Sequence, residues 1–440
     1  ERPTSIEPAP ARAEGDGPYE QLIVRGVTLV SGTGAPPVGP VDIVIEGTVI
    51  RRIVGVGVPG VPIDPDRRPE LAAGGHELDA AGMFVMPGMT ESHVHLSYAN
   101  AHPSLLDRQP EPTAMLDAVD NARTLLWYGF TSANSYGSAQ GIDVPLRDAI
   151  DAGRIPGPRL LASERDLGST GSNADAQSPG SEGRKRIADG PWAVRAAVRE
   201  VAKAGADVVK IFLDGEELST HAAPGVLSYT DEEVAAACEE AHARRLRVAC
   251  HARSAGAVKQ AVRHGVDFVG HANFLDDEAV EMLAAARDRL CVGPGIAWEI
   301  QLLERGHEIG LSRSRMEARG YQREIDETIS AVKRLREVGV PIVIGGDYGL
   351  SITPHGTNAK DLQYFVELFD MSPAEALLCA TRDGGRAADP SGMLGTLEAE
   401  TSADLVIVDG DPTADIAVLQ NADRISGVMK AGHLHAGLLG

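Results

Sequence analysis

Eight short apolar runs alternate with longer amphipathic stretches from about residue 84 to residue 347. The runs read MFVMPGM, FTSANSY, RLLASE, DVVKIFL, RVACHA, DFVGHA, LCVGPG and IVIGGD. Each is short and bounded by Gly, Asp or Pro, as in parallel strands that are buried on both faces. Apolar residues recur at helical spacing in the stretches between them, for example from Met115 to Leu126. The pattern predicts repeated β–α units.

Two helix starts can be located from capping signals. Thr230 is followed three residues later by Glu233, which is typical of a capping box and predicts a helix that runs to about residue 245. Ser372 and Glu375 have the same spacing, with Pro373 at the first helical position. Both signals lie between or after the apolar runs, where the β–α pattern requires helices.

Eight such units predict an α/β fold with a closed (β/α)₈ barrel over residues 84–392. An open doubly wound sheet is the alternative, but it would need an early GxGxxG, which the chain lacks. The flanking segments 20–83 and 393–440 contain short strands rich in Val, Ile and Thr. We expect them to form one small β-sandwich domain. Residues 1–19 are predicted to be a flexible arm.

Composition limits the possible partners. The 440 residues contain 63 acidic and 41 basic side chains, a net charge of −22. This charge disfavours nucleic acid and anionic membranes, and no transmembrane run is present. The four cysteines form no CxxC and the start of the chain has no secretory signal, so we expect a cytoplasmic protein. A small-molecule substrate and a homo-oligomeric state are the remaining expectations.

Candidate ligands for a metal ion lie at the carboxyl ends of the predicted barrel strands, where active sites of this architecture form. In the motif His93-Val-His95, both imidazoles can point to the same side because residues i and i+2 do so on an extended chain. Imidazole and carboxylate suit Zn²⁺ and similar ions. The full set in strand order is His93, His95, Lys210, His251, His271 and Asp347.

No single member of this set is decisive. A lone histidine at a strand end is more often a packing residue than a ligand, and a lysine in a strand can pair with a core acid. A second HxH, His433-Leu-His435, lies in the last predicted strand without partner ligands, and we interpret it as unrelated to metal binding. The joint order of six residues on five strands is what favours a metal site.

With these motifs in place, the sequence resembles the amidohydrolase superfamily from about residue 21 to residue 440. Pro87-Gly88 before the HxH pair is similar to that family's first-strand signature. Gly205-Ala-Asp before Lys210, and Gly346-Asp347 before Pro354-His-Gly, are similar to its fourth and eighth strands. One departure is Glu91, since relatives commonly have Asp there. That position supports the ligands rather than binding metal, so the departure is tolerable.

The resemblance implies a binuclear hydrolase that cleaves amide-like bonds by attack of a metal-bridging hydroxide. His93 and His95 would hold one ion and His251 and His271 the other. A carbamylated Lys210 would bridge the two ions, with zinc as the first expectation and cobalt, manganese or iron possible. Asp347 would contact the first ion and move the proton. Asp347, Lys210 and His271 would thus be the catalytic residues.

The subgroup and the substrate stay open. Prolidase-like and imidazolonepropionase-like members share the Lys210 pattern, while ESHVHLSYA resembles the molinate and phenylurea hydrolases, which cleave thiocarbamates and ureas. His93 departs from the phenylurea enzymes, which can carry Asn at that position. Candidate substrate contacts follow the predicted strands; they are Tyr136, His221, Tyr229, Arg253, Asn273, Trp298 and His355.

Three functions are therefore compared. The first is hydrolysis of a urea, carbamate, thiocarbamate or N-acyl amine. The second is a dipeptidase or N-acyl amino acid carboxypeptidase, which needs a cation for the substrate carboxylate, and Arg253 is the candidate. The third is a catalytically silent binding or assembly barrel, which the intact ligand set disfavours. The Gly/Ser-rich segment 168–190 is a candidate lid, because long loops in compact domains are often functional.

Overall fold

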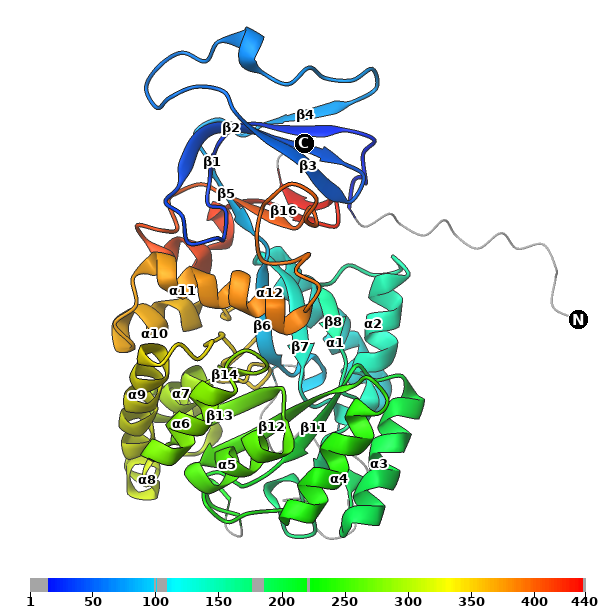
Figure 1. The fold of residues 1–440 in the computed structure, drawn as a ribbon, viewed down its shortest axis with the longest axis vertical. Coiled ribbons are helices and arrows are strands. Elements are labelled where there is room, and N and C mark those ends of the chain that lie inside the picture. The colour runs from blue at the N-terminus through cyan, green and yellow to red at the C-terminus, as the bar shows by residue number, and fades with distance from the viewer. Residues whose placement is uncertain (1–14, 99, 101–108, 176–185, 220–221, 438–440) are drawn as a thin grey trace, which may run out of the picture.

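A computed structural model of the chain describes residues 15–98, 100, 109–175, 186–219 and 222–437. A part built mainly of strands lies beside a larger part in which strands alternate with helices (Figure 1). Most of the predicted flexible arm falls outside the described residues, as does the middle of the predicted lid. The described ends of that lid contain the short parallel strands β9 (Leu167–Gly168) and β10 (Arg186–Ile187).

The strand-rich part combines both ends of the chain in one eight-stranded sheet. Its strands run in the order β17-β16-β15-β5-β1-β2-β3, and β4 pairs with β1. The pairing shows a single hydrogen-bonded sheet, so the predicted sandwich of two sheets is not confirmed. The strands are β1 (Leu22–Leu29), β2 (Val38–Glu46), β3 (Val49–Gly55), β4 (His76–Asp79), β5 (Phe84–Pro87), β15 (Leu405–Val408), β16 (Ile425–Lys430) and β17 (His433–Gly437).

The larger part contains two parallel sheets, β6-β7-β8 and β10-β9-β11-β12-β13-β14. Single contacts join their edges: Ala162 O accepts from Asp207 N at 2.7 Å, and bridges pair Val292 with Ile342 and Val94 with Tyr348. The strand order therefore follows the chain, although the ladders do not close continuously. The strands are β6 (Met89–Val94), β7 (Phe130–Ser135), β8 (Arg159–Leu161), β11 (Val208–Phe212), β12 (Arg247–Ser254), β13 (Phe268–Phe274) and β14 (Cys291–Gly293).

Two of the eight predicted strands differ in the structure. The first apolar run contains two strands, and β5 belongs to the eight-stranded sheet, where Val85 packs in that sheet's own apolar cluster. The chain passes from one sheet to the other at Gly88. The Gly88 N–H donates to the backbone carbonyl of Asp404, next to β15, whereas the Met89 N–H donates to the carbonyl of Gly129, next to β7. The last run, IVIGGD, forms only isolated bridges, because its Gly pair interrupts the ladder.

Helices cover the outside of the parallel strands (Figure 1). Both predicted capping boxes are present: Thr230 and Glu233 bond each other's backbone, as do Ser372 and Glu375. The helices are α1 (Glu111–Trp127), α2 (Asp143–Asp151), α3 (Pro191–Ala204), α4 (Asp231–His242), α5 (Ala255–His264), α6 (Asp277–Ala285), α7 (Ile296–Arg305), α8 (Arg313–Arg319), α9 (Tyr321–Glu337), α10 (Lys360–Leu368), α11 (Pro373–Ala380) and α12 (Arg382–Ala388). Within the described ranges, no helix combines the length and apolarity needed to span a bilayer.

Candidate metal centre

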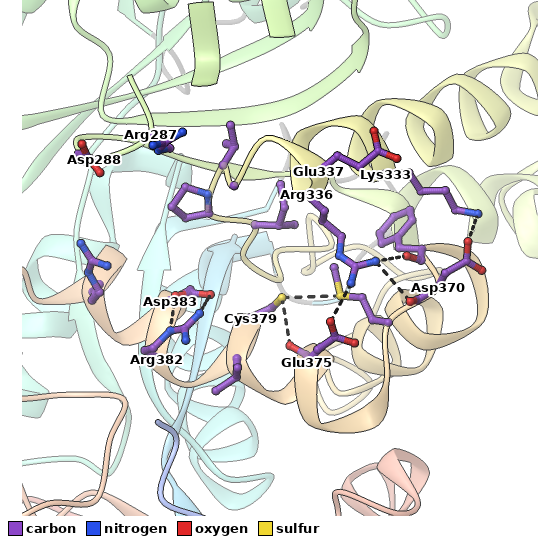
Figure 2. A pocket seen from close by; sticks show the side chains of 18 residues that line it. Arg287, Asp288, Lys333, Arg336, Glu337, Asp370, Glu375, Cys379, Arg382 and Asp383 are labelled. Carbon is purple, nitrogen blue, oxygen red and sulfur yellow. Dashed lines mark hydrogen bonds and ion pairs between the residues drawn. The ribbon is translucent and has the colours of Figure 1, made fainter. Parts of the chain in front are cut away.

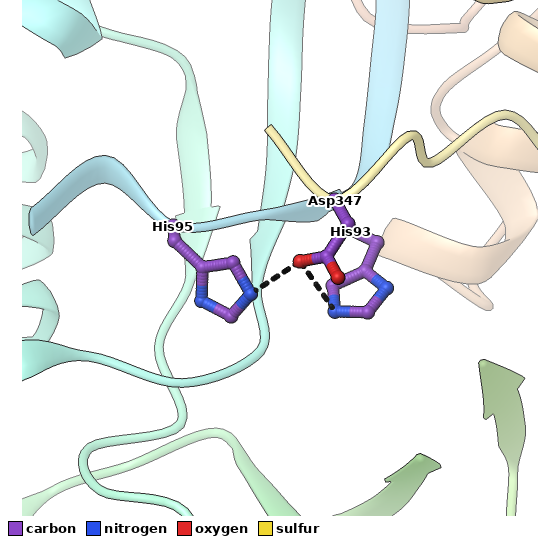
Figure 3. A group of neighbouring side chains, drawn as sticks. All are labelled: His93, His95 and Asp347. Atoms are coloured by element: carbon purple, nitrogen blue, oxygen red, sulfur yellow. Dashed lines mark hydrogen bonds and ion pairs between the residues drawn. The ribbon is translucent and has the colours of Figure 1, made fainter. Parts of the chain in front are cut away.

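The end of β6 carries the first two histidines of the site. His95 Nε2 lies 2.8 Å and His93 Nε2 3.7 Å from Asp347 Oδ1, so the carboxylate faces both imidazoles (Figure 3). His95 Nδ1 is held by Gly137 O at 2.8 Å, which fixes the ring orientation. Among the described residues, only His93, His95 and Asp347 form a group of three or more His, Cys, Asp or Glu ligand atoms within 4.8 Å of one another.

Asp347 reaches this group from a strained turn. Its φ is +61°, in a region that costs a non-glycine residue free energy and persists only where the surroundings enforce it. Gly345, two residues before Asp347, approaches His93 so closely that a Cβ on Gly345 would lie 2.9 Å from the His93 Cβ. Its N–H donates to the buried carboxylate of Asp361 at 3.1 Å. The strain is therefore located where Asp347 turns towards the histidines.

Lys210, His251 and His271 lie next to this group, on β11, β12 and β13. Lys210 Nζ is 3.4 Å from His93 Nε2. The His271 ring centroid lies 5.5 Å from that of His93 and 4.4 Å from that of His251. All three side chains are buried. The structure thus brings the six predicted ligand residues together, from five different segments of the chain.

Burial sets the electrostatics of the centre. Loss of hydration lowers the pKa of His93, His251 and His271 well below 6.5. The charge of Arg253 lowers all three pKa values further, and that of Lys210 lowers those of His93 and His251. Burial alone would raise the pKa of Asp347, but the neighbouring His93 and His95 outweigh it and hold that pKa well below its usual range. These shifts favour neutral His93, His251 and His271 beside an ionised carboxylate, which are the protonation states that a divalent cation requires.

The residues fit a metal ion by a second criterion. Both ring nitrogens of His271 and the Nδ1 of His93 are buried without a hydrogen-bond partner. Buried polar atoms are nearly always satisfied, so these orphaned imidazole nitrogens are consistent with a ligand that the protein itself does not supply. The four imidazoles and the carboxylate of the cluster are a donor set that suits zinc and related ions.

The profile of the Amidohydrolase family matches residues 84–434, which include all six of these side chains. The chain belongs to the amidohydrolase family. It is also 28% identical to ochratoxinase from Aspergillus niger over 376 residues, which cover 80% of this chain and 76% of that enzyme. Ochratoxinase and the other members of the amidohydrolase family are hydrolases, and so is this protein.

Solved structures extend the comparison. A prolidase complexed with N-methylphosphonate-L-proline superposes with a TM-score of 0.84 at 26% identity, covering 95% of this chain and all of that one. A Xaa-Pro dipeptidase with bound methionine gives 0.82 at 27% identity, with the same coverage. Molinate hydrolase and phenylurea hydrolase B, from the group that the sequence resembles, give 0.72 at 19% and 20% identity and share the fold alone.

The predicted substrate contacts occupy different surroundings in the amidohydrolase. Tyr136 packs against the rings of His93 and Phe268, with centroids 5.6 and 4.6 Å away, so it lies beneath the centre. Trp298 and Tyr229 are buried in the main core, although Trp298 Nε1 and the Tyr229 hydroxyl have no partner there. His355 Nε2 bonds the carbonyl of His95 at 3.2 Å, so it holds the loop. His221 lies outside the described residues.

Arg253 is placed differently from the carboxylate anchor that the sequence predicts. It is 0% exposed, and its guanidinium is ion-paired with Glu299, Glu324 and Glu216. Asn273 is also buried, and its amide donates to Glu299 and to Thr328. Both side chains therefore take part in a buried protein network, in which three glutamates from distant parts of the chain converge on one arginine. This placement disfavours the predicted substrate contacts, which stay predictions.

Replacing Arg253 tests whether it is a structural partner of the glutamates or a substrate anchor. We expect Arg253→Met to lower the free energy of unfolding by about 3–5 kcal/mol, because it leaves buried glutamates without a cation. Urea unfolding measures the effect, with the exposed Arg313→Met as the control. Residual activity should fall equally on neutral and carboxylate-bearing substrates. A stable variant that loses only carboxylate substrates would restore the anchor role.

Buried polar residues support this centre, and two of them, Asn358 and Asp361, have no signal of their own in the sequence. Glu91 is fully buried and accepts hydrogen bonds from the His93 N–H at 3.2 Å and from the Asn358 amide at 2.9 Å. It lies outside the group of His93, His95 and Asp347. It therefore supports the HxH segment, as expected. Asn358 and Asp361 lie on the loop and helix that follow the eighth run, and only the fold brings them beneath His93.

A large cavity lies away from these residues. It encloses about 780 Å³ between the end of α9, the segment before Ile342, and helices α11 and α12 (Figure 2). None of the predicted site residues lines it. Its charges compensate one another, as in Lys333–Asp370 at 2.5 Å and Arg336–Glu375 at 3.1 Å. Size alone therefore does not identify the functional site of this protein.

Proposed function

We propose that this amidohydrolase is a binuclear metal-dependent hydrolase of an amide-like C–N bond in a small molecule. The convergence of His93, His95 and Asp347 with Lys210, His251 and His271 carries the proposal. The parallel strand order and the edge contacts support a closed (β/α)₈ barrel, whose carboxyl end would hold these residues.

The protein's own residues divide the work. His93 and His95 would hold one ion and His251 and His271 the other. Divalent ions supply an acidified water and polarise the scissile carbonyl when bound. Asp347, whose Oδ1 faces both first-strand histidines, would accept the proton of the attacking water and pass it to the leaving nitrogen.

Lys210 would bridge the two halves as a carbamate, with zinc as the proposed metal. Its Nζ lies 3.4 Å from His93 Nε2. A bare ammonium there opposes metal binding, since its charge already lowers the pKa of His93 and His251. Loss of a proton from the ammonium gives the free amine. Its reaction with CO₂ forms an N–C bond and releases a second proton, so the cation becomes an anion that metals can share.

The substrate class that we propose first is a dipeptide or an N-acyl amino acid. Two solved structures above 25% identity are named as a prolidase and a Xaa-Pro dipeptidase. These names support a peptide-like amide for this chain. The anchor for the substrate carboxylate would then come from a residue other than Arg253.

A neutral amide, urea, carbamate or thiocarbamate is the second candidate, and one observation favours it. Arg253, the cation that the sequence offered for a substrate carboxylate, is enclosed by three glutamates. A site without that cation suits an uncharged substrate.

A mixed panel of substrates tests the proposal. Metal-loaded protein would be incubated with dipeptides, N-acyl amino acids, aryl ureas, carbamates and thiocarbamates, and products identified by mass spectrometry. Metal content would be counted in the same sample. We expect two ions per chain and turnover of the carboxylate-bearing group. Turnover confined to neutral compounds would favour the second candidate.

The second HxH provides the matched control. His433 and His435 lie on β17 with ring centroids 6.3 Å apart, outside the metal-ligand group. We expect His95→Asn to remove metal and turnover, whereas His433→Asn keeps both. A wild-type protein without metal, and without rescue by Zn²⁺, Co²⁺ or Mn²⁺, would instead favour a silent barrel. Reloading in CO₂-free buffer should be slow if Lys210 is carbamylated.

A further inference from the structure

One buried carboxylate touches the strand ends that carry both members of the second histidine pair. Glu299 lies in the first turn of α7 and is 0% exposed. Its Oε1 accepts from Arg253 Nη1 at 3.3 Å and from Asn273 Nδ2 at 2.5 Å. Arg253 is two residues beyond His251, and Asn273 is two beyond His271. The carboxylate therefore joins β12 to β13 just past the two imidazoles.

The backbone that it holds is strained. His271 has a φ of +79° and Ala272 a φ of +53°, directly before Asn273. Residues in this region cost about 1–3 kcal/mol each and need external contacts to stay there. Asn273 directly follows these two strained residues, and its side-chain amide donates a hydrogen bond to Glu299 Oε1. It supplies such a contact at the point where β13 turns to aim the His271 ring.

The same turn of α7 also packs against the ring itself. A Cβ on Gly295 would lie 2.7 Å from His271 Nδ1, so the start of this helix fits directly against the imidazole. On its other side, Glu299 Oε2 lies 3.1 Å from the Thr328 hydroxyl on α9. The Glu299 carboxylate is thus held by α7, which carries it, and by Thr328 on α9, and it in turn holds the ends of β12 and β13.

We propose that Glu299 is a positioning residue for the second metal ion: it keeps His251 and His271 at the separation and orientation that the ion requires. The inference rests on the proposed function, since it assumes that this pair binds metal. Partners of metal ligands that act in this way change affinity by 10–100-fold when removed.

Glu324 provides a matched comparison. It is also fully buried and pairs with the same Nη1 of Arg253, but it has no hydrogen bond to Asn273. If Glu299 served only to neutralise Arg253, the two glutamates would be equivalent. If Glu299 positions the histidines through both strand ends, only its replacement should affect the metal.

The test is a Co²⁺ titration of apoprotein, followed by metal counting and by the visible spectrum of the bound ion. We expect two ions per wild-type chain. Glu299→Gln should weaken the second ion at least about tenfold and change its spectrum, while Glu324→Gln should bind as the wild type does. Thr328→Val removes the hydroxyl that contacts both Glu299 Oε2 and the Asn273 amide, without changing charge. It should weaken the second ion less than Glu299→Gln does, and it decides the matter if Glu299→Gln does not fold.

Equal weakening by Glu299→Gln and Glu324→Gln, or a second ion bound by both Glu299→Gln and Thr328→Val with wild-type affinity, would overturn the inference alone. His271→Asn separates this from failure of the proposed function. If it binds as many ions as the wild type, the pair is not a metal site, and both proposals fall together.

Discussion

Asp347→Asn is expected to lower the kcat of this enzyme by about 10³-fold. The amide keeps the size of the side chain and tolerates a positive φ nearly as well as Asp does. It cannot, however, accept the proton that the proposed mechanism assigns to Asp347. Steady-state kinetics on a substrate found in the panel measure the loss, and the far-ultraviolet spectrum and thermal midpoint check the fold.

The control for this substitution is Asp370→Asn. Asp370 has a φ of +54°, close to the +61° of Asp347, but it lies at the large cavity and pairs with Lys333 (Figure 2). The two changes are therefore equal in chemistry and in backbone conformation. We expect Asp370→Asn to keep wild-type kcat. If Asp347→Asn retained more than a tenth of the activity, proton transfer would have to be assigned to another group.

The second large effect is expected from Gly295→Ala, which should lower kcat/KM by about 100-fold. The added methyl group would lie 2.7 Å from His271 Nδ1, so either the imidazole or the start of α7 must move. A displacement of about 1 Å in a catalytic site costs about 10²-fold in rate. Kinetics and metal counting on the same sample show whether the loss follows release of the second ion.

Gly310→Ala separates this steric effect from backbone strain. Gly310 has a φ of +77°, similar to the +68° of Gly295, and nothing lies within 4 Å of the position of its Cβ. Both alanines pay a similar cost for the left-handed conformation, about 1 kcal/mol. We expect Gly310→Ala to lower stability slightly and to leave kcat/KM unchanged. Equal loss in the two variants would show that the backbone, not the contact with His271, causes it.

The local patterns predicted much of the fold correctly. Capping boxes depend on side chains three residues apart, so Thr230–Glu233 and Ser372–Glu375 could be located from the sequence. The first apolar run was harder to interpret. Its composition does not reveal that the chain leaves one sheet and enters another at Gly88, because both strands are buried and apolar. That division depends on partners about 40 and 320 residues away along the chain.

By itself, the sequence determined the candidate ligands and the family, because His93, His95, Lys210, His251, His271 and Asp347 recur at the ends of predicted strands, where parallel topology must bring them together. Only the tertiary structure decided what surrounds them. Arg253 has the position of a substrate anchor along the chain, yet Glu299 and Glu324 come from two distant helices to enclose it. The position of a residue along a strand specifies which way its side chain points. The partners of that side chain depend on how distant segments pack, and those segments share no local sequence pattern.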